Sequence, residues 1–139
     1  PEVVFNFETR KYRLLEEITR LSAAIITLQE VDHFADFFEP ALLKYGYSGL
    51  FQHKASSDAP ACGWTSDGVA VFWKTDDFKL EKSTAFTSVK ATDGSDVKST
   101  GLIVSLMHKT LKTCVRQTIT SILSFLHSFL THTHTHTHA

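Results

Sequence analysis

The chain has 139 residues and a formal net charge of −1, from 14 basic and 15 acidic side chains. This length suits one domain. Charges of both signs are mixed along the chain, so composition gives no overall basic surface for nucleic acid. The two cysteines, Cys62 and Cys114, are too few for a disulfide framework, so we expect a reducing compartment and no disulfide-linked partner.

Hydropathy argues against a membrane protein. No apolar run is long enough to span a bilayer, and no basic-then-apolar leader opens the chain, so we expect no membrane partner. The chain begins at Pro1 rather than Met, so we expect the true N-terminus to be absent. The expected location is the cytoplasm, with a mitochondrial location as the alternative.

Two amphipathic segments predict helices in the first third of the chain. Apolar residues at helical spacing predict a helix over 10–21 with Thr9 as its N-cap. A second apolar stripe predicts a helix over 31–45, which Gly46 ends. Pro40 lies inside this second segment, so we expect a break or a new first turn there. The apolar face of the first helix comprises Leu14, Leu15, Ile18 and Leu21.

Short apolar runs predict strands between and after these helices. Residues 24–31 form a β-branched run that is typical of a strand buried on both faces. We expect this run, 47–52 and 69–73 to be neighbours in one sheet, with the two helices covering one face. Residues 78–86 alternate in hydropathy and are expected to pair with 69–73.

The later part of the chain reads as loops and a hairpin. Residues 55–67 are rich in Ser, Ala, Pro and Gly and predict a loop, and 92–100 predict a polar turn. Residues 102–107 and 113–118 predict the two arms of a hairpin. The alternation of helices and strands indicates a layered α/β domain.

Glu30 is the first candidate functional residue, because it lies at the exit of the predicted strand over 24–31. A carboxylate at the end of a buried strand is costly to desolvate unless a cation or hydrogen-bond donors meet it. The carboxyl ends of strands in open α/β sheets are also where ligands bind. Glu30 is therefore a candidate metal ligand, and a solvated surface carboxylate is the alternative.

The residues around Glu30 resemble a known family. Leu28-Gln29-Glu30-Val31-Asp32-His33-Phe34 is followed by Gly46-Tyr47-Ser48-Gly49-Leu50-Phe51, Lys54 and Asp67-Gly68-Val69-Ala70-Val71-Phe72. This succession resembles the endonuclease/exonuclease/phosphatase superfamily, specifically its deadenylase-like branch. The resemblance implies an αββα sandwich, of which this chain is a fragment. We expect a partial domain over 1–120 and a tail of unrelated, low-complexity sequence over 121–139.

The resemblance also implies chemistry. Enzymes of this family hydrolyse phosphate esters with Mg²⁺, and Glu30 matches their metal-binding and catalytic glutamate. Lys54 matches a basic residue that binds the substrate phosphates. The implied activity is a 3′-to-5′ exonuclease on poly(A) RNA, with a 2′-phosphatase acting on NADP(H) as one alternative and a non-catalytic interaction module as another.

Other parts of the family site are absent from the sequence. The family requires an upstream Asn, an Asp-x-Asn segment and a Ser-Asp-His set, but the single asparagine is Asn6 and neither segment occurs. One metal ligand cannot hold Mg²⁺ against its hydration shell, so we expect this chain alone to be inactive. We interpret Asp67 as a structural turn residue. We interpret His33 and His53 as structural histidines, with contact to substrate as the alternative for either one.

The last residues carry a different signal. Residues 131–138 alternate strictly between Thr and His, as a translated CA dinucleotide repeat would. Weak and unselective metal binding by the histidines is the alternative. We expect the segment from about Ser121 onward to lie outside the folded core.

Overall fold

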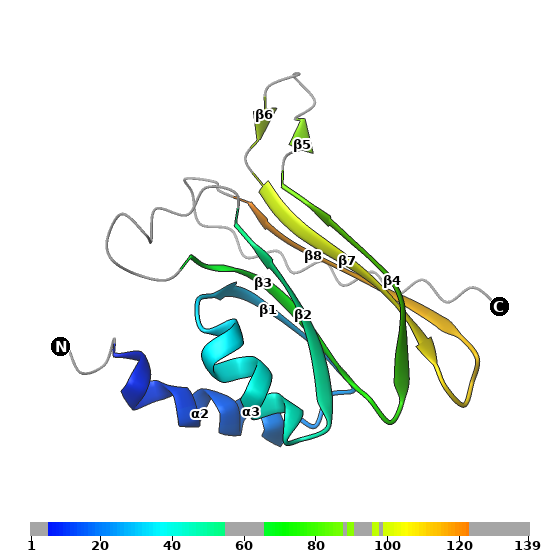
Figure 1. Ribbon diagram of the computed structural model, residues 1–139, viewed down its shortest axis with the longest axis horizontal. Helices are drawn as coiled ribbons and strands as arrows, with labels where there is room; N and C mark the ends of the chain where they lie inside the picture. Colours follow the sequence, from blue (N-terminus) through cyan, green and yellow to red (C-terminus); the bar gives the residue numbers. More distant parts are fainter. Residues whose placement is uncertain (1–5, 55–65, 88, 91–95, 98, 123–139) are drawn as a thin grey trace.

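The computed structural model describes residues 6–54, 66–87, 89–90, 96–97 and 99–122. Within these ranges the chain forms three layers (Figure 1): a helical layer, a first sheet and a second sheet packed behind it. The mixed α/β class predicted from the sequence is confirmed. The layers correspond to αββ, and the described residues place no helix on the outer face of the second sheet.

Helix α2 spans Phe7–Arg20 and begins three residues earlier than the sequence predicts. The N-cap is Asn6 rather than Thr9, because the Asn6 side chain accepts a hydrogen bond from the Glu8 backbone N–H at 2.9 Å. Two apolar residues of the predicted face, Leu15 and Ile18, pack on the core. The other two, Leu14 and Leu21, are exposed, so the buried stripe is narrower than predicted.

The second helical segment is shorter than the predicted 31–45. Strand β1 keeps Val31, and the segment consists of a π-helical turn η1 over Phe34–Phe38 and a short helix α3 over Glu39–Leu43. Pro40 lies in the first turn of α3, where its missing N–H needs no partner, so the predicted new first turn is confirmed. The segment ends at Gly46, whose φ of 78° is a left-handed conformation that glycine adopts without strain.

The first sheet contains the three strands that the sequence grouped together. It is formed by β1 (Ile25–Val31), β2 (Tyr47–His53) and β3 (Gly68–Lys74), in the order β1-β3-β2 with antiparallel pairing. The helical layer covers one face (Figure 1), as predicted. One expectation is wrong: β1 is an edge strand, and Thr27 and Gln29 are exposed rather than buried.

The second sheet corrects a predicted pairing. Strand β4 (Phe78–Phe86) pairs with β7 (Ser99–His108) and not with β3, because the chain crosses from one sheet to the other after Lys74. The predicted hairpin is confirmed, since β7 pairs with β8 (Cys114–Ile122). Ser99 and Thr100 belong to β7, although the sequence placed them in a polar turn.

Strand β3 divides the core into two clusters. Val69, Val71 and Trp73 face the second sheet and pack with Leu102, Val104, Leu106 and Ile119. Ala70 and Phe72 face the helices and pack with Ile26, Phe38, Leu42 and Tyr47. Alternate side chains of one strand therefore join the three layers.

The end of the described chain differs slightly from expectation. Strand β8 runs through Ser121 and Ile122, which pair with Thr100 and Ser99, so regular structure passes the predicted boundary by two residues. The rest of the predicted tail, 123–139, lies outside the described residues, as does most of the predicted loop over 55–67.

The remaining elements are the short pair β5 (Val89–Lys90) and β6 (Asp96–Val97). Within the described part of the chain, no helix is both long and apolar enough to cross a membrane.

Candidate active site

The candidate site lies at one end of the first sheet, where β1 and β2 end and β3 begins, and this end is called the active-site edge. Because both outer strands are antiparallel to β3, they run parallel to each other and finish at the same edge. The register shows this directly, since Gly68 at the start of β3 faces Val31 on one side and His53 on the other. Glu30 and Lys54 therefore come from the two strand ends that flank Gly68.

Glu30 occupies a β-bulge. The β1–β3 register shifts between Gln29 and Val31, so Glu30 has no partner residue on β3. Its φ is 54°, a left-handed conformation that is uncommon for a non-glycine residue and is often found at functional sites. A bulge re-aims a side chain relative to its strand. The Glu30 side chain is exposed, and among the described residues it makes no hydrogen bond or ion pair.

Lys54 is held on the other side of the same edge. Its Nζ lies 3.1 Å from Oδ2 of Asp67, and the two side chains are only 16% and 19% exposed. The backbone N–H of Lys54 also donates to the Asp67 carbonyl oxygen at 2.9 Å. These contacts fix the position of Lys54 against the start of β3. Asp67 is thus more than the turn residue that the sequence indicated, because it orients the candidate phosphate-binding lysine.

The sequence did not reveal Asp67 as the partner of Lys54. The two residues are thirteen positions apart, across a segment without a periodic pattern. Only the β2–β3 register, which pairs Gln52 with Val69 and His53 with Gly68, brings them together.

The two nearby histidines both make contacts with neighbouring side chains. His33 stacks on Phe7 with ring centroids 3.9 Å apart, and its Nδ1 lies 2.6 Å from Oδ2 of Asp36. These contacts join η1 to α2. His53 is exposed, and its ring makes a T-shaped contact with the Phe51 ring, with the ring centroids 4.7 Å apart.

Mg²⁺ binding can be tested against the side chains present. A magnesium site requires near-octahedral oxygen coordination and commonly uses more than one protein or substrate oxygen. Within the described residues, no three side chains of His, Cys, Asp or Glu are grouped to hold a metal. Glu30 alone at this edge does not fit a resident Mg²⁺.

Other candidate residues stay outside the site. Trp73 is buried in the core, and Cys114 is exposed and free. Trp64 and Cys62 lie outside the described residues. His108 lies at the β7–β8 hairpin, where its Nδ1 accepts hydrogen bonds from the backbone N–H groups of Thr110 and Leu111.

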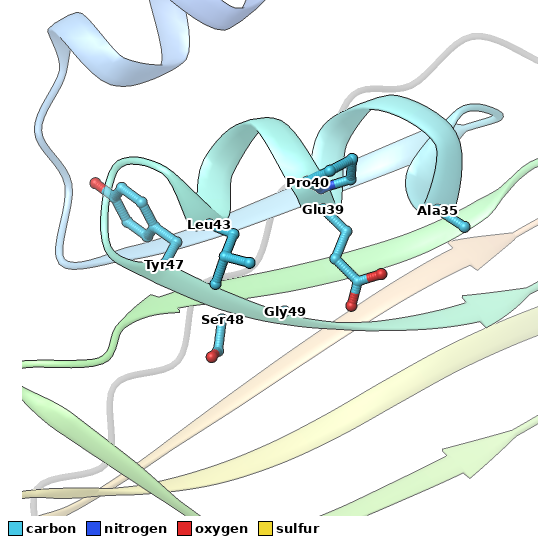
Figure 2. A pocket seen from close by; sticks show the side chains of 7 residues that line it. All are labelled: Ala35, Glu39, Pro40, Leu43, Tyr47, Ser48 and Gly49. Atoms are coloured by element: carbon cyan, nitrogen blue, oxygen red, sulfur yellow. The ribbon is translucent and has the colours of Figure 1, made fainter.

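A hollow of about 280 Å³ opens elsewhere, beside α3 and the first residues of β2 (Figure 2). Its lining includes Glu39, Leu43, Tyr47, Ser48 and Gly49. None of these residues belongs to the edge that carries Glu30 and Lys54. The hollow and the candidate active site are therefore separate features, which share only strand β2.

Comparison with known proteins gives relatives that are much longer than this chain. No family model matches. Nocturnin of Mus musculus is 40% identical over 86 residues, which are 60% of this chain and 20% of nocturnin. Carbon catabolite repressor protein 4 homolog 1 of Arabidopsis thaliana is 45% identical over 75 residues, 52% of this chain and 12% of that protein. The exoribonuclease subunit Ccr4 of Candida glabrata is 36% identical over 84 residues, 58% of this chain and 10% of that protein.

Solved structures agree with these relatives. The catalytic domain of human nocturnin with a bound sulfate anion superposes with a TM-score of 0.72 at 31% identity, over 81% of this chain and 42% of that one. ANGEL2, described as a 2′,3′-cyclic phosphatase, superposes with a TM-score of 0.66 at 22% identity, over 81% of this chain and 32% of that one. The chain thus spans less than half of each solved domain and at most a fifth of the curated relatives named here.

Proposed function

Because sequence and fold relate this chain to the deadenylase-like branch of the endonuclease/exonuclease/phosphatase superfamily, we propose that it supplies one wall of a phosphoesterase site. Its relatives are hydrolytic nucleases and phosphatases of that superfamily. Glu30 is the proposed metal-binding and catalytic residue of this wall. Lys54 is the proposed binding residue for substrate phosphates.

The observation that carries this proposal is the bulge at Glu30. A left-handed glutamate costs about 1–2 kcal/mol of backbone strain relative to an ordinary strand residue. Within the described chain, no hydrogen bond or ion pair of its carboxylate compensates that strain. An exposed carboxylate that no described side chain engages, at the shared end of two strands, is available to a ligand, and backbone outliers of this kind are often found at functional sites.

Lys54 contributes a cation at the same edge. An ammonium is a compact point charge that attracts phosphate oxygens and does not need the bidentate geometry of arginine. Asp67 limits the rotamers of Lys54 before substrate arrives, so less side-chain entropy is lost when a phosphate binds. The side chains of this wall therefore bind and orient a phosphate.

The proposed substrate is RNA with a poly(A) 3′ end, cleaved from its 3′ end. Support comes from a relative whose name includes 3′-5′-exoribonuclease. The 2′-phosphate of NADP(H) remains the second candidate, since it also offers a phosphate near adenosine. The proposed cofactor is Mg²⁺, held by Glu30 only when further ligands complete its coordination. The proposed location is the cytoplasm.

We also propose that the 139-residue chain alone is inactive. Within the described residues Glu30 has no companion ligands, and the sequence contains no Asp-x-Asn or Ser-Asp-His segment. The expected result is no Mg²⁺-dependent release of AMP from poly(A) and no release of phosphate from NADP(H).

The experiment grafts this chain into the matching part of mouse nocturnin, whose remaining length supplies the other segments. The chimera is expected to hydrolyse one of the two substrates, and Glu30→Ala should abolish that activity. Lys54→Ala should raise KM more than it lowers kcat. Glu16→Ala, on the exposed face of α2, is the matched control and should leave activity unchanged. Hydrolysis by the ungrafted chain that persists after Glu30→Ala would refute two claims: that Glu30 is the catalytic residue, and that the chain alone is inactive.

A further inference from the structure

The outer edge of β2 carries backbone groups that no described strand uses. Strand β2 is the last in the order β1-β3-β2, so within the described residues only its inner edge is paired. The Thr75 N–H donates to Gly46 O, and the Lys54 N–H donates to Asp67 O, both at 2.9 Å. Hydrogen-bonded pairs alternate in an antiparallel ladder, so Ser48, Leu50 and Gln52 direct their backbone groups toward β3. The backbone groups of Tyr47, Gly49 and Phe51 therefore point outward.

In the part of the chain that the structure describes, this edge has no bulge, lysine, arginine or proline to prevent strand addition. Natural edge strands are interrupted by bulges or carry lysine or proline. The β2–β3 register is unbroken from Tyr47 to His53, and the strand contains no Lys, Arg or Pro. The opposite edge strand, β1, has the bulge at Glu30. Of the two edges of the first sheet, β2 is the one that is open to a regular partner strand.

The hollow of about 280 Å³ lies directly beside the outward-facing groups of Tyr47 and Gly49. Figure 2 shows the Glu39 side chain extending from the helical segment toward β2, with Leu43 beside it. The apolar part of the wall is formed by Ala35, Pro40 and Leu43, and Leu43 is 62% exposed. A bound side chain with an aliphatic stem and a polar head group would suit this hollow, because the stem would contact the apolar wall and the head group would meet the carboxylate.

Charge decides which head group fits. Glu39 is the one acidic residue among those that line the hollow, and none of them is basic. In the described chain its carboxylate forms no hydrogen bond or ion pair. Lys74, which pairs with Tyr47 across β2 and β3, does not line the hollow: its Nζ lies 4.7 Å from the centre of the Tyr47 ring and 3.5 Å from the Tyr45 carbonyl oxygen. An occupant of the hollow should therefore bring its own positive charge.

We propose that the outer edge of β2 binds an extended peptide as an added strand, with an arginine or lysine side chain of that peptide in the hollow against Glu39. Main-chain hydrogen bonds to Tyr47, Gly49 and Phe51 supply affinity, and the hollow supplies sequence preference. A second copy of this chain fits less well, because β2 itself offers no basic residue to Glu39. This binding surface is independent of the proposed phosphoesterase site.

The test uses the ¹⁵N-labelled 139-residue chain and the peptide acetyl-Thr-Val-Arg-Val-Thr-amide. With peptide at ten times its dissociation constant, amide exchange should slow about tenfold at Tyr47, Gly49 and Phe51. Exchange at Ser48 and Leu50, whose amides already pair with β3, should change little. A peptide with glutamate in place of arginine should not bind at the same concentration.

Two controls separate strand addition from simple charge attraction. Glu39→Gln should weaken binding of the arginine peptide about fivefold, whereas Glu16→Gln, an exposed carboxylate on α2, should not change it. Two further peptides carry N-methyl groups on alternate amides, one on the odd-numbered and one on the even-numbered residues. Only one of the two sets of amides faces β2, so one of these peptides should lose binding and the other should keep it.

Three outcomes would overturn the proposal. One is an unchanged exchange rate at Tyr47, Gly49 and Phe51 with millimolar peptide. Another is an equal affinity for the arginine and glutamate peptides, or binding of both N-methylated peptides. The third is protection of these amides without peptide, together with a concentration-dependent rise in sedimenting mass, which would assign the edge to a second copy of the chain.

Discussion

Gly68 joins the two strand ends of the candidate site, and its substitution tests that geometry. A Cβ at position 68 would lie 2.2 Å from the Gln52 carbonyl oxygen and 2.6 Å from the Phe51 ring. The carbonyl oxygen is part of the backbone, so it cannot move aside without disturbing the β2–β3 ladder. We therefore expect Gly68→Ala to separate the ends of β2 and β3.

The size of the effect follows from overpacking. Inserting a methyl group into a tightly packed place costs about 1–3 kcal/mol, and contact with backbone favours the upper end. For a domain of this size, 1–3 kcal/mol corresponds to a fall in Tm of roughly 3–15 °C. The measurement is urea unfolding of the wild-type chain and the variant, followed by circular dichroism.

Gly46→Ala is the matched control. A Cβ at Gly46 would meet nothing within 4 Å, but its φ of 78° is unfavourable for alanine. That conformational cost is about 1–2 kcal/mol, without steric overlap. If Gly68→Ala were as stable as wild type, or clearly less damaging than Gly46→Ala, the close approach of β2 to Gly68 would be wrong.

Two further predictions concern contacts near the two sites. In a double-mutant cycle, Lys54→Met and Asp67→Asn should show a coupling of about 1 kcal/mol, because the ion pair is mostly shielded from solvent; additive effects on urea unfolding would contradict the contact. Tyr47→Phe should destabilise the chain by about 1 kcal/mol, because the Tyr47 hydroxyl donates to the Ala23 carbonyl oxygen at 2.6 Å; an unchanged unfolding midpoint would show that this hydrogen bond contributes nothing.

Hydropathy was sufficient to predict the first sheet. The runs that became β1, β2 and β3 are short, apolar and bounded by turn residues, which are signals that depend only on local sequence. The Gly46 stop and the new turn at Pro40 were also predictable, since both residues restrict the backbone wherever they occur.

Features that depend on distant contacts were not predictable in the same way. Strand β4 alternates as a strand should, but nothing in its residues distinguishes pairing with β3 from pairing with β7. A fully buried strand and an edge strand with one apolar face also look alike when the run is rich in β-branched residues, as β1 is. The ion pair of Lys54 with Asp67 required the register of two strands to be known.

Glu30 shows where a family resemblance and physical reasoning support each other. Spacing alone leaves a carboxylate at the end of a strand, which is more often solvated than functional. The bulge adds an independent observation, because strain in the backbone is retained only where something compensates it. The β1–β3 pairing on both sides holds the bulge in place, and within the described residues the Glu30 carboxylate forms no hydrogen bond or ion pair. The proposal requires further ligands because one carboxylate cannot hold Mg²⁺.

Strand β2 carries both proposed sites, and its length keeps them apart. Lys54 is five positions after Gly49, which lies beside the hollow, and a strand rises about 17 Å over five positions. A five-residue peptide centred on Gly49 reaches only to Phe51 and leaves the Lys54 end uncovered. A peptide longer by three residues at that end would extend past His53 and reach Lys54. The hollow and the active-site edge share no side chain. A bound peptide therefore affects phosphate binding only if it is long enough to reach Lys54.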